Sequence, residues 1–156
     1  MNKLPVFTSS RSCGTCTKCC EGWLSATVHG NQMHKGRPCF YLDKDCSACS
    51  IYADRPQDPC IDYSCTWLLD KSDEFPMWMK PNISNVIITN REVENGGNIY
   101  RYVDIIEAGS RMDVDVLNWL FHWVMTKGVN VRYEVSGNKF ILGDPSFAEA
   151  LSNEKI

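Results

Sequence analysis

The residues that point most clearly to a chemistry are the nine cysteines, all of which lie between residues 13 and 65. The run opens with the segment Cys13-Gly-Thr-Cys16-Thr-Lys-Cys19-Cys20. A Cys-x-x-Cys turn lets two sulfurs approach one soft metal ion from a single loop. We therefore expect a thiolate metal site, and the cysteines expected to converge there, most of them as ligands, are Cys13, Cys16, Cys19, Cys20, Cys39, Cys49, Cys60 and Cys65.

The composition around the cysteines also favours metal binding. Residues 13–70 are rich in glycine and proline turns and lack a regular hydrophobic pattern. A segment of this kind usually folds when metal ligation supplies the stability that burial cannot. A disulfide-stapled secreted domain is the alternative, but an odd cysteine count and an adjacent Cys19-Cys20 pair weigh against it.

The N-terminal residues lack the apolar core of a signal peptide, and no segment approaches 18 apolar residues. We therefore expect no membrane span and a location in the reducing cytoplasm, where structural disulfides are rare. The net charge of −3 and the absence of a basic run argue against nucleic acid as a partner.

The order of the cysteine blocks resembles a known family. After the opening segment come Pro38-Cys39-Phe40-Tyr41-Leu42, Cys49-Ser-Ile51-Tyr52, Arg55-Pro56 and Cys60-Ile-Asp62-Tyr63-Ser-Cys65-Thr-Trp67-Leu68. Over residues 13–68 the chain is similar to the CxxCxxCC family, whose members are described as zinc- or iron-chelating proteins. It departs from the family pattern at Ile61, where an arginine is usual, and Cys46 lies outside the pattern. The resemblance implies a bound metal and says little about a reaction.

The identity and number of the metal ions stay open at the level of sequence. Eight cysteines suit two tetrahedral zinc sites, a zinc cluster with shared thiolates, or one iron–sulfur cluster with thiols to spare. The first three cysteines match the start of a bacterial [4Fe–4S] motif, but Cys20 follows Cys19 at once. Neighbouring side chains tend to point apart, so Cys19 and Cys20 could serve different ions. We expect Zn²⁺ or iron, with a [4Fe–4S] cluster as the alternative.

Other residues near the cysteines have simpler interpretations. We expect His29 and His34 to be exposed loop residues, and Cys46 to be a free thiol or a packing residue that is dispensable for metal binding. Arg55 and Asp62 could orient ligands, pair with the anionic cluster or form loop ion pairs. Three tryptophans should screen the site from water: Trp23, Trp67 and Trp78.

No sequence motif identifies an enzyme. The chain contains no phosphate-binding loop, no G-x-S-x-G and no H-E-x-x-H. The sequence therefore favours a metal-binding protein whose metal organises the fold and a surface for a partner protein. The alternatives are an iron–sulfur enzyme or enzyme subunit, of a redox or methyl-transfer type, and an intracellular metal carrier or sensor. The methyl-transfer alternative follows from a resemblance to proteins that methylate flagellin lysines and carry a similar cysteine motif.

The second half of the chain has the regular patterns that the first half lacks. The sequence predicts strands at 86–89, 99–107, 129–135 and 139–142, a helix at 113–127, and a short helix at 145–151. The expected fold is α+β, with an irregular, metal-stabilised cysteine module at 1–70 packed on a small antiparallel β-β-α-β-β unit at 71–156. The two parts could also form one cooperative domain.

Overall fold

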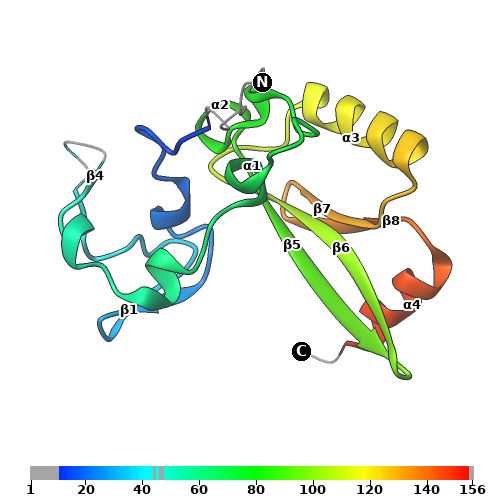
Figure 1. Cartoon of the computed structure of the whole chain (residues 1–156), viewed down its shortest axis with the longest axis horizontal. Coiled ribbons are helices and arrows are strands. Elements are labelled where there is room, and N and C mark those ends of the chain that lie inside the picture. Colours follow the sequence, from blue (N-terminus) through cyan, green and yellow to red (C-terminus); the bar gives the residue numbers. More distant parts are fainter. Residues whose placement is uncertain (1–10, 44, 46–47, 155–156) are drawn as a thin grey trace, which may run out of the picture.

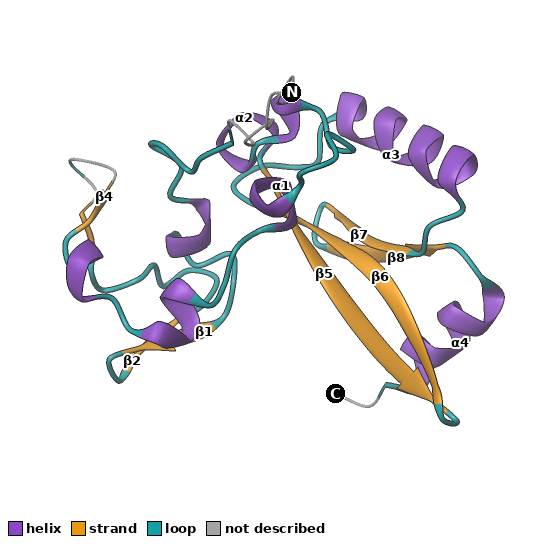
Figure 2. Cartoon of the chain, viewed as in Figure 1, coloured by secondary structure: helices purple, strands orange, loops and turns teal. Residues whose placement is uncertain are grey.

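A computed structural model of the chain describes residues 11–43, 45 and 48–154. The cysteine-rich part lies at one side of the molecule, and the large sheet lies at the other with its two longest helices (Figures 1 and 2). Cys46 lies outside the described residues, so its predicted role stays a prediction. The α+β class is confirmed.

The cysteine-rich part consists of short elements joined by turns. Two small antiparallel sheets are formed by β1 (Ala26–Val28) with β2 (Asn31–Met33) and by β3 (Leu42–Asp43) with β4 (Ala48–Cys49). The remaining elements are the 3-10 helices η1 and η2, the π-helix η3 and one turn of α-helix, α1. Their bounds are η1 (Lys18–Cys20), η2 (Tyr52–Asp54), η3 (Gln57–Ile61) and α1 (Thr66–Leu69). The short η4 (Met77–Met79) and α2 (Pro81–Ser84) then lead into the sheet.

The sheet has four strands in the order β5-β6-β7-β8. A long hairpin joins β5 (Val86–Asn95) to β6 (Asn98–Glu107) through Gly96 and Gly97, whose φ angles of 61° and 83° suit a two-residue turn. A second hairpin joins β7 (Val131–Val135) to β8 (Asn138–Leu142). The predicted order of elements, β-β-α-β-β followed by a short helix, is confirmed.

The expectation of a wholly antiparallel sheet is wrong. Strands β6 and β7 pair in parallel, with Asp104 opposite Arg132. The reason is the connection between them, because α3 (Val114–Lys127) lies in the crossover and returns the chain to the starting end of the sheet. The sheet is therefore mixed, with two antiparallel hairpins joined by one β-α-β unit.

The two long helices cover opposite faces of the sheet. The cap of α3 is Asp113, whose side chain accepts a hydrogen bond from the N–H of Asp115, and the helix ends at Gly128 with φ 66°. The residues that α3 buries are Val116, Leu120 and Trp123, whereas Phe121 is 43% exposed. On the other face, α4 (Pro145–Asn153) packs Phe147 and Ala150 against the β5–β6 hairpin.

The main hydrophobic core contains residues from both halves of the sequence. Cys65 and Trp67 pack in one cluster with Phe75, Met79 and buried residues of the sheet and α3. Trp23 and Leu24 pack against the same cluster. The cysteine-rich part is therefore joined to the sheet by a shared core, at the segment that follows Cys65. No helix among residues 11–154 that are described has the length and apolar character needed to cross a membrane.

Candidate metal centre

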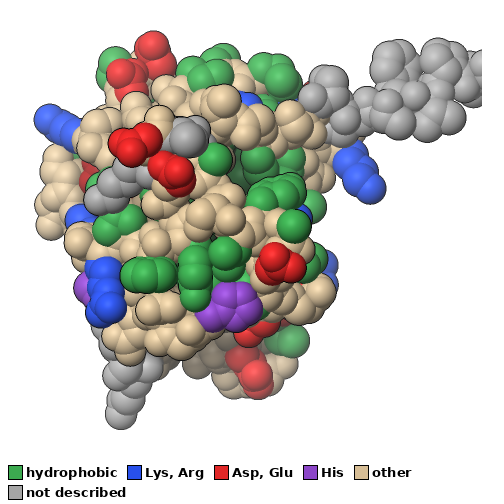
Figure 3. All heavy atoms as spheres, turned by 90° about the vertical axis from the view of Figure 1, so that its left-hand side faces the viewer, with side chains coloured by type: hydrophobic (Ala, Val, Ile, Leu, Met, Phe, Trp, Pro, Cys, Tyr) green, Lys and Arg blue, Asp and Glu red, His purple; other side chains and the backbone are tan. Residues whose placement is uncertain are grey.

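The eight predicted ligand cysteines are all free thiols. Cys65 is buried, Cys13 is exposed, and the other six are half-buried. Figure 3 shows the side of the molecule that the cysteine-rich part forms, where hydrophobic side chains, a class that there includes cysteine, lie between charged groups. None of these eight sulfurs is in a disulfide, so each can ligate a soft metal ion once it loses its proton.

The first four cysteines are carried by two consecutive tight turns. The N–H of Cys16 donates to the carbonyl of Cys13 at 2.8 Å, and the N–H of Cys20 donates to the carbonyl of Thr17 at 2.8 Å. Gly14 has a φ of 53°, which the first turn needs and glycine provides at little cost. These turns fix the backbone of a segment that has no hydrophobic pattern of its own.

Backbone pairing brings the middle cysteines close to Cys20. The N–H of Cys39 donates to the carbonyl of Cys20 at 2.8 Å, and the N–H of Leu42 donates to the carbonyl of Cys39 at 3.1 Å. Cys49 lies opposite Leu42 in the small sheet formed by β3 and β4. Cys20, Cys39 and Cys49 are therefore connected through hydrogen-bonded neighbours.

Cys65 lies at the start of α1, at the edge of the main core. The backbone N–H groups of Leu68 and Trp67 hydrogen-bond to its sulfur and partly offset the effect of burial, which raises the pKa of the Cys65 thiol. Nearby Cys13 and Cys16 raise this pKa further. The environment thus holds Cys65 as a thiol in the metal-free state, while its hydrogen bonds are of the kind that stabilise a thiolate.

We group Cys13, Cys16, Cys19 and Cys65 as a first thiol set, because Cys13 and Cys16 both raise the pKa of Cys19 and that of Cys65. Burial raises the pKa of Cys19, and the largest contribution from another thiol comes from Cys65. Cys20, Cys16 and Cys13 follow. The pKa of Cys13 is likewise raised, first by burial and then by Cys16.

A second thiol set surrounds Cys20 and consists of Cys20, Cys39, Cys49 and Cys60. Burial raises the pKa of Cys20 to about 11, helped in descending order by Cys39, Cys49 and Cys60, with Cys13 last. The pKa of Cys60 is raised by burial and then by Cys39 and Cys49. The thiol with the largest effect on Cys19 is therefore Cys65, and the one with the largest effect on Cys20 is Cys39, although the two sets meet at this adjacent pair, where Cys20 also acts on Cys19.

Two basic side chains lie close enough to influence these thiols. The ammonium of Lys80 is 5.7 Å from the ring centre of Trp67 and lies near Gly14, in the turn between Cys13 and Cys16. Lys80 and Arg55 both lower the pKa of Cys13, and Arg55 also lowers that of Cys60. Arg55 is thus placed to offset negative charge on both thiol sets.

The thiols are neighbours but do not form a finished coordination shell. Within residues 11–43, 45 and 48–154, no three His, Cys, Asp or Glu side chains are already arranged to hold a metal ion. The residues fit a thiolate-bound metal in their number, redox state and grouping, and ligation would require the sulfurs of each set to draw together. The predicted ligand set therefore stays a prediction.

The other residues singled out in the sequence have mixed positions. His29 and His34 are both exposed, and their ring nitrogens lie 3.3 Å from the carbonyl of Asp54 and 3.0 Å from that of Lys35. Trp67 is buried and Trp23 is half-buried against the main core, but Trp78 is 39% exposed. Two of the three tryptophans are therefore placed to exclude water near Cys65.

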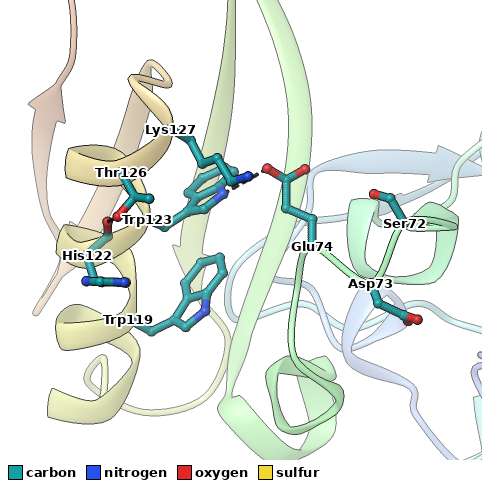
Figure 4. A pocket seen from close by; sticks show the side chains of 8 residues that line it. All are labelled: Ser72, Asp73, Glu74, Trp119, His122, Trp123, Thr126 and Lys127. Atoms are coloured by element: carbon teal, nitrogen blue, oxygen red, sulfur yellow. Dashed lines mark hydrogen bonds between the residues drawn. The ribbon is translucent and has the colours of Figure 1, made fainter.

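The structure also contains a hollow that the sequence analysis did not identify. It measures about 500 Å³, and Figure 4 shows its lining residues, Ser72, Asp73, Glu74, Trp119, His122, Trp123, Thr126 and Lys127. Trp119 and Trp123 stack at 5.2 Å, and the indole N–H of Trp123 donates to Glu74 at 2.9 Å. The signal in the sequence was the pair of tryptophans one helical turn apart. No cysteine lines this hollow, so it is separate from the thiol sets.

Comparisons with known proteins add no relative to this description. No family model, curated protein or solved structure matches the chain.

Proposed function

We propose that the chain is a metal-binding protein of the reducing cytoplasm, in which the two thiol sets hold zinc or iron as thiolates. The observation that carries the proposal is the division of the adjacent Cys19 and Cys20 between two groups of four free thiols. Four thiolates are the usual shell of a structural zinc ion, so two sets of four suit two ions. Cys13, Cys16, Cys19 and Cys65 would hold one, and Cys20, Cys39, Cys49 and Cys60 the other.

The surroundings of the thiol sets support this assignment. Four thiolates around one divalent ion carry a net negative charge, which Arg55 and Lys80 would offset from the positions described above. The buried indole of Trp67 belongs to the same core cluster as Cys65 and would limit access of water to it.

The bound metal would act mainly on the fold. The described residues between 13 and 61 form only strands of two or three residues and short helices, so few backbone hydrogen bonds hold them. Ligands drawn from both ends of this segment would close it onto the main core, because Cys65 belongs to that core. The ordered segment would then present exposed Phe40, Tyr52 and Ile61 to a partner protein.

Metal analysis of anaerobically purified protein tests the proposal. We expect about two zinc or iron ions per chain and a colourless protein if zinc is bound. A brown protein that absorbs near about 400 nm and bleaches with dithionite would instead favour the iron–sulfur enzyme or enzyme subunit. Rapid loss of metal to a chelator without loss of structure would favour a carrier or sensor. Absence of any metal after anaerobic purification and reconstitution would contradict all three.

A further inference from the structure

The strand β8 forms one edge of the four-stranded sheet (Figure 2). Four of its five residues are exposed, and Leu142 is half-buried. Among the described residues, no strand pairs with its outer side. Phe140 is 46% exposed and Ile141 is 38% exposed, so apolar groups are accessible on both faces of this edge. An edge of this kind is a template for pairing with another strand.

The turn between β7 and β8 determines which backbone groups of β8 point outward. Ser136 and Gly137 have φ angles of 52° and 81°, which identifies a two-residue type I′ turn. Such a turn is closed by a hydrogen-bonded pair, here Val135 and Asn138, and hydrogen-bonded pairs then alternate along the hairpin. The backbone groups of Phe140 therefore point toward β7, and those of Lys139 and Ile141 point toward the free edge.

An aromatic strip lies beside this edge on the face that α3 covers. Phe140 stacks on Tyr133 at 5.4 Å, and Tyr133 meets Phe121 of α3 edge-on at 6.0 Å. Phe121 is 43% exposed, and Met125, one turn further along α3, is 86% exposed. The strip therefore continues from the edge strand onto the helix and leaves apolar surface in contact with water.

We propose that a second copy of this chain pairs antiparallel along β8, with the twofold axis beside Phe140. This register places Lys139 opposite Ile141 of the second copy on both sides of the axis, so all outward N–H and C=O groups of these residues find partners. Phe140 then lies opposite its own copy in a pair that is not hydrogen-bonded, where side chains approach most closely. The two sheets become one continuous sheet of the two copies.

The register and the charges favour a second copy over an unrelated strand. The outward N–H and C=O groups belong to Lys139 and Ile141, one residue on either side of Phe140. Two copies of the strand can therefore pair about a twofold axis at Phe140 with every one of these groups matched. Each Lys139 faces an isoleucine rather than another lysine, and on its own sheet it pairs with Glu134. The two aromatic strips also meet at the axis and cover each other. Because the interface is small, we expect a dissociation constant on the order of 10–100 μM.

Sedimentation of the full reduced chain over a range of concentrations tests the proposal. We expect the apparent mass to double, and Ile141→Pro to raise the dissociation constant about tenfold or more, because it removes an intermolecular donor but none from the β7–β8 hairpin. Ile99→Pro is a matched control. Ile99 is also exposed, lies one residue after a two-residue turn and directs its N–H away from its hairpin partner. It should leave dimerisation unchanged.

Amide exchange separates loss of pairing from loss of folding. At concentrations that favour the dimer, the amides of Lys139 and Ile141 should become protected, whereas that of Phe140 should be protected at all concentrations. A chain that stays monomeric near about 1 mM, or whose Lys139 and Ile141 amides exchange fast throughout, would overturn the proposal. A monomer that pairs only with an added extended peptide would overturn the choice of a second copy.

Discussion

Cys19 and Cys20 show how far the spacing of residues in the sequence can predict a metal site. The spacing in the sequence was sufficient to identify eight cysteines as candidates and to expect that these two would point apart. It could not assign their partners, because Cys39, Cys49, Cys60 and Cys65 reach them only through the path of the loops. Hydrogen bonds such as that from Cys39 to the carbonyl of Cys20 determine this path, and no local pattern predicts them.

Substitution of single cysteines should distinguish the two thiol sets. Cys16→Ser should reduce the metal bound per chain by about half, because one set loses a ligand while the other stays complete. Cys49→Ser should have the same effect through the other set, and the double variant should lose nearly all metal. Cys46→Ser is the control and should leave the metal content unchanged. Complete loss of metal in either single variant would indicate one shared cluster instead of two separate sites.

The raised thiol pKa values predict how the metal-free protein responds to alkaline pH. The pKa of Cys20 rises from an ordinary value of 9.0 to about 11, and those of Cys19 and Cys65 are also raised. The folded chain binds these thiol protons more tightly than the unfolded chain does, so the bound protons stabilise the fold. This stabilisation is complete below pH 9, where the thiols are protonated in both states. The fold loses that stability as the pH rises toward about 11.

Urea unfolding at several pH values, with and without zinc, measures this effect. The metal-free protein should become less stable above pH 9, whereas the zinc-loaded protein should resist, because its thiolates have already released their protons. The half-buried Tyr63 and the buried Tyr102 and Tyr133 also have raised pKa values, and they titrate in both forms. The difference between the two forms therefore isolates the thiols. An equal loss in both forms would show that the thiols are not the cause.

At the scale of elements, the periodic patterns in the sequence predicted the helices and strands whose formation depends on neighbouring residues. Alternating residues and a glycine turn identified the hairpins, and α3 was predicted to within a residue of its observed start. The parallel pairing of β6 with β7 was missed, because it follows from where α3 packs and not from either strand. The length of β5 was also underestimated. Its outer half, including Arg91, Glu92 and Glu94, is polar and is held in the strand by pairing with β6.

The sheet offers a direct comparison between a buried and an exposed ion pair. Asp104 is 3% exposed and accepts hydrogen bonds from Arg91 at 2.9 Å and from Arg132 at 2.8 and 3.0 Å. Asp104→Asn should lower the free energy of unfolding by about 2 kcal/mol, because charged hydrogen bonds across three strands are lost.

Glu92→Gln is the matched control, since it removes an exposed pair with Arg101 on the same hairpin. It should change the free energy of unfolding by no more than about 0.5 kcal/mol. Urea denaturation of the metal-loaded protein measures both values. Similar losses for the two variants would mean that burial does not set the contribution of Asp104.

At the scale of the whole molecule, the shared core connects the two sequence halves unevenly. Residues 26–49 contribute two small sheets and half-buried cysteines, whereas Cys65 and Trp67 belong to the main core. A division near residue 70 was predicted from composition and stays a prediction. The core shows that the segment just before residue 70 packs with the sheet, which composition could not reveal because that contact is between distant segments.

Removal of the metal should therefore loosen the chain in a graded way. Amides in β1, β2, β3 and β4 should exchange rapidly in the metal-free protein, because little besides ligation would hold these short strands. Amides in the paired parts of β6 and β7 should stay protected, and so should those of Leu69 and Asp70, which are bonded within the turn of α1. Exchange measured by mass spectrometry before and after chelation gives the comparison. A simultaneous loss of protection everywhere would show one cooperative unit built around its metal.

Arg11 gives this arrangement a further property. Its side chain is buried, lies 4.8 Å from the ring centre of Trp67 and donates to the carbonyl of Trp67 at 3.1 Å. One residue lies between Arg11 and Cys13, and one lies between Cys65 and Trp67. The contact thus acts as a tether that raises the effective concentration of one sulfur around the other, although 51 residues lie between them in the chain. Binding of a metal ion by Cys13 and Cys65 closes the loop of chain between them. Most of the entropy cost of closing that loop would already have been met when the chain folded.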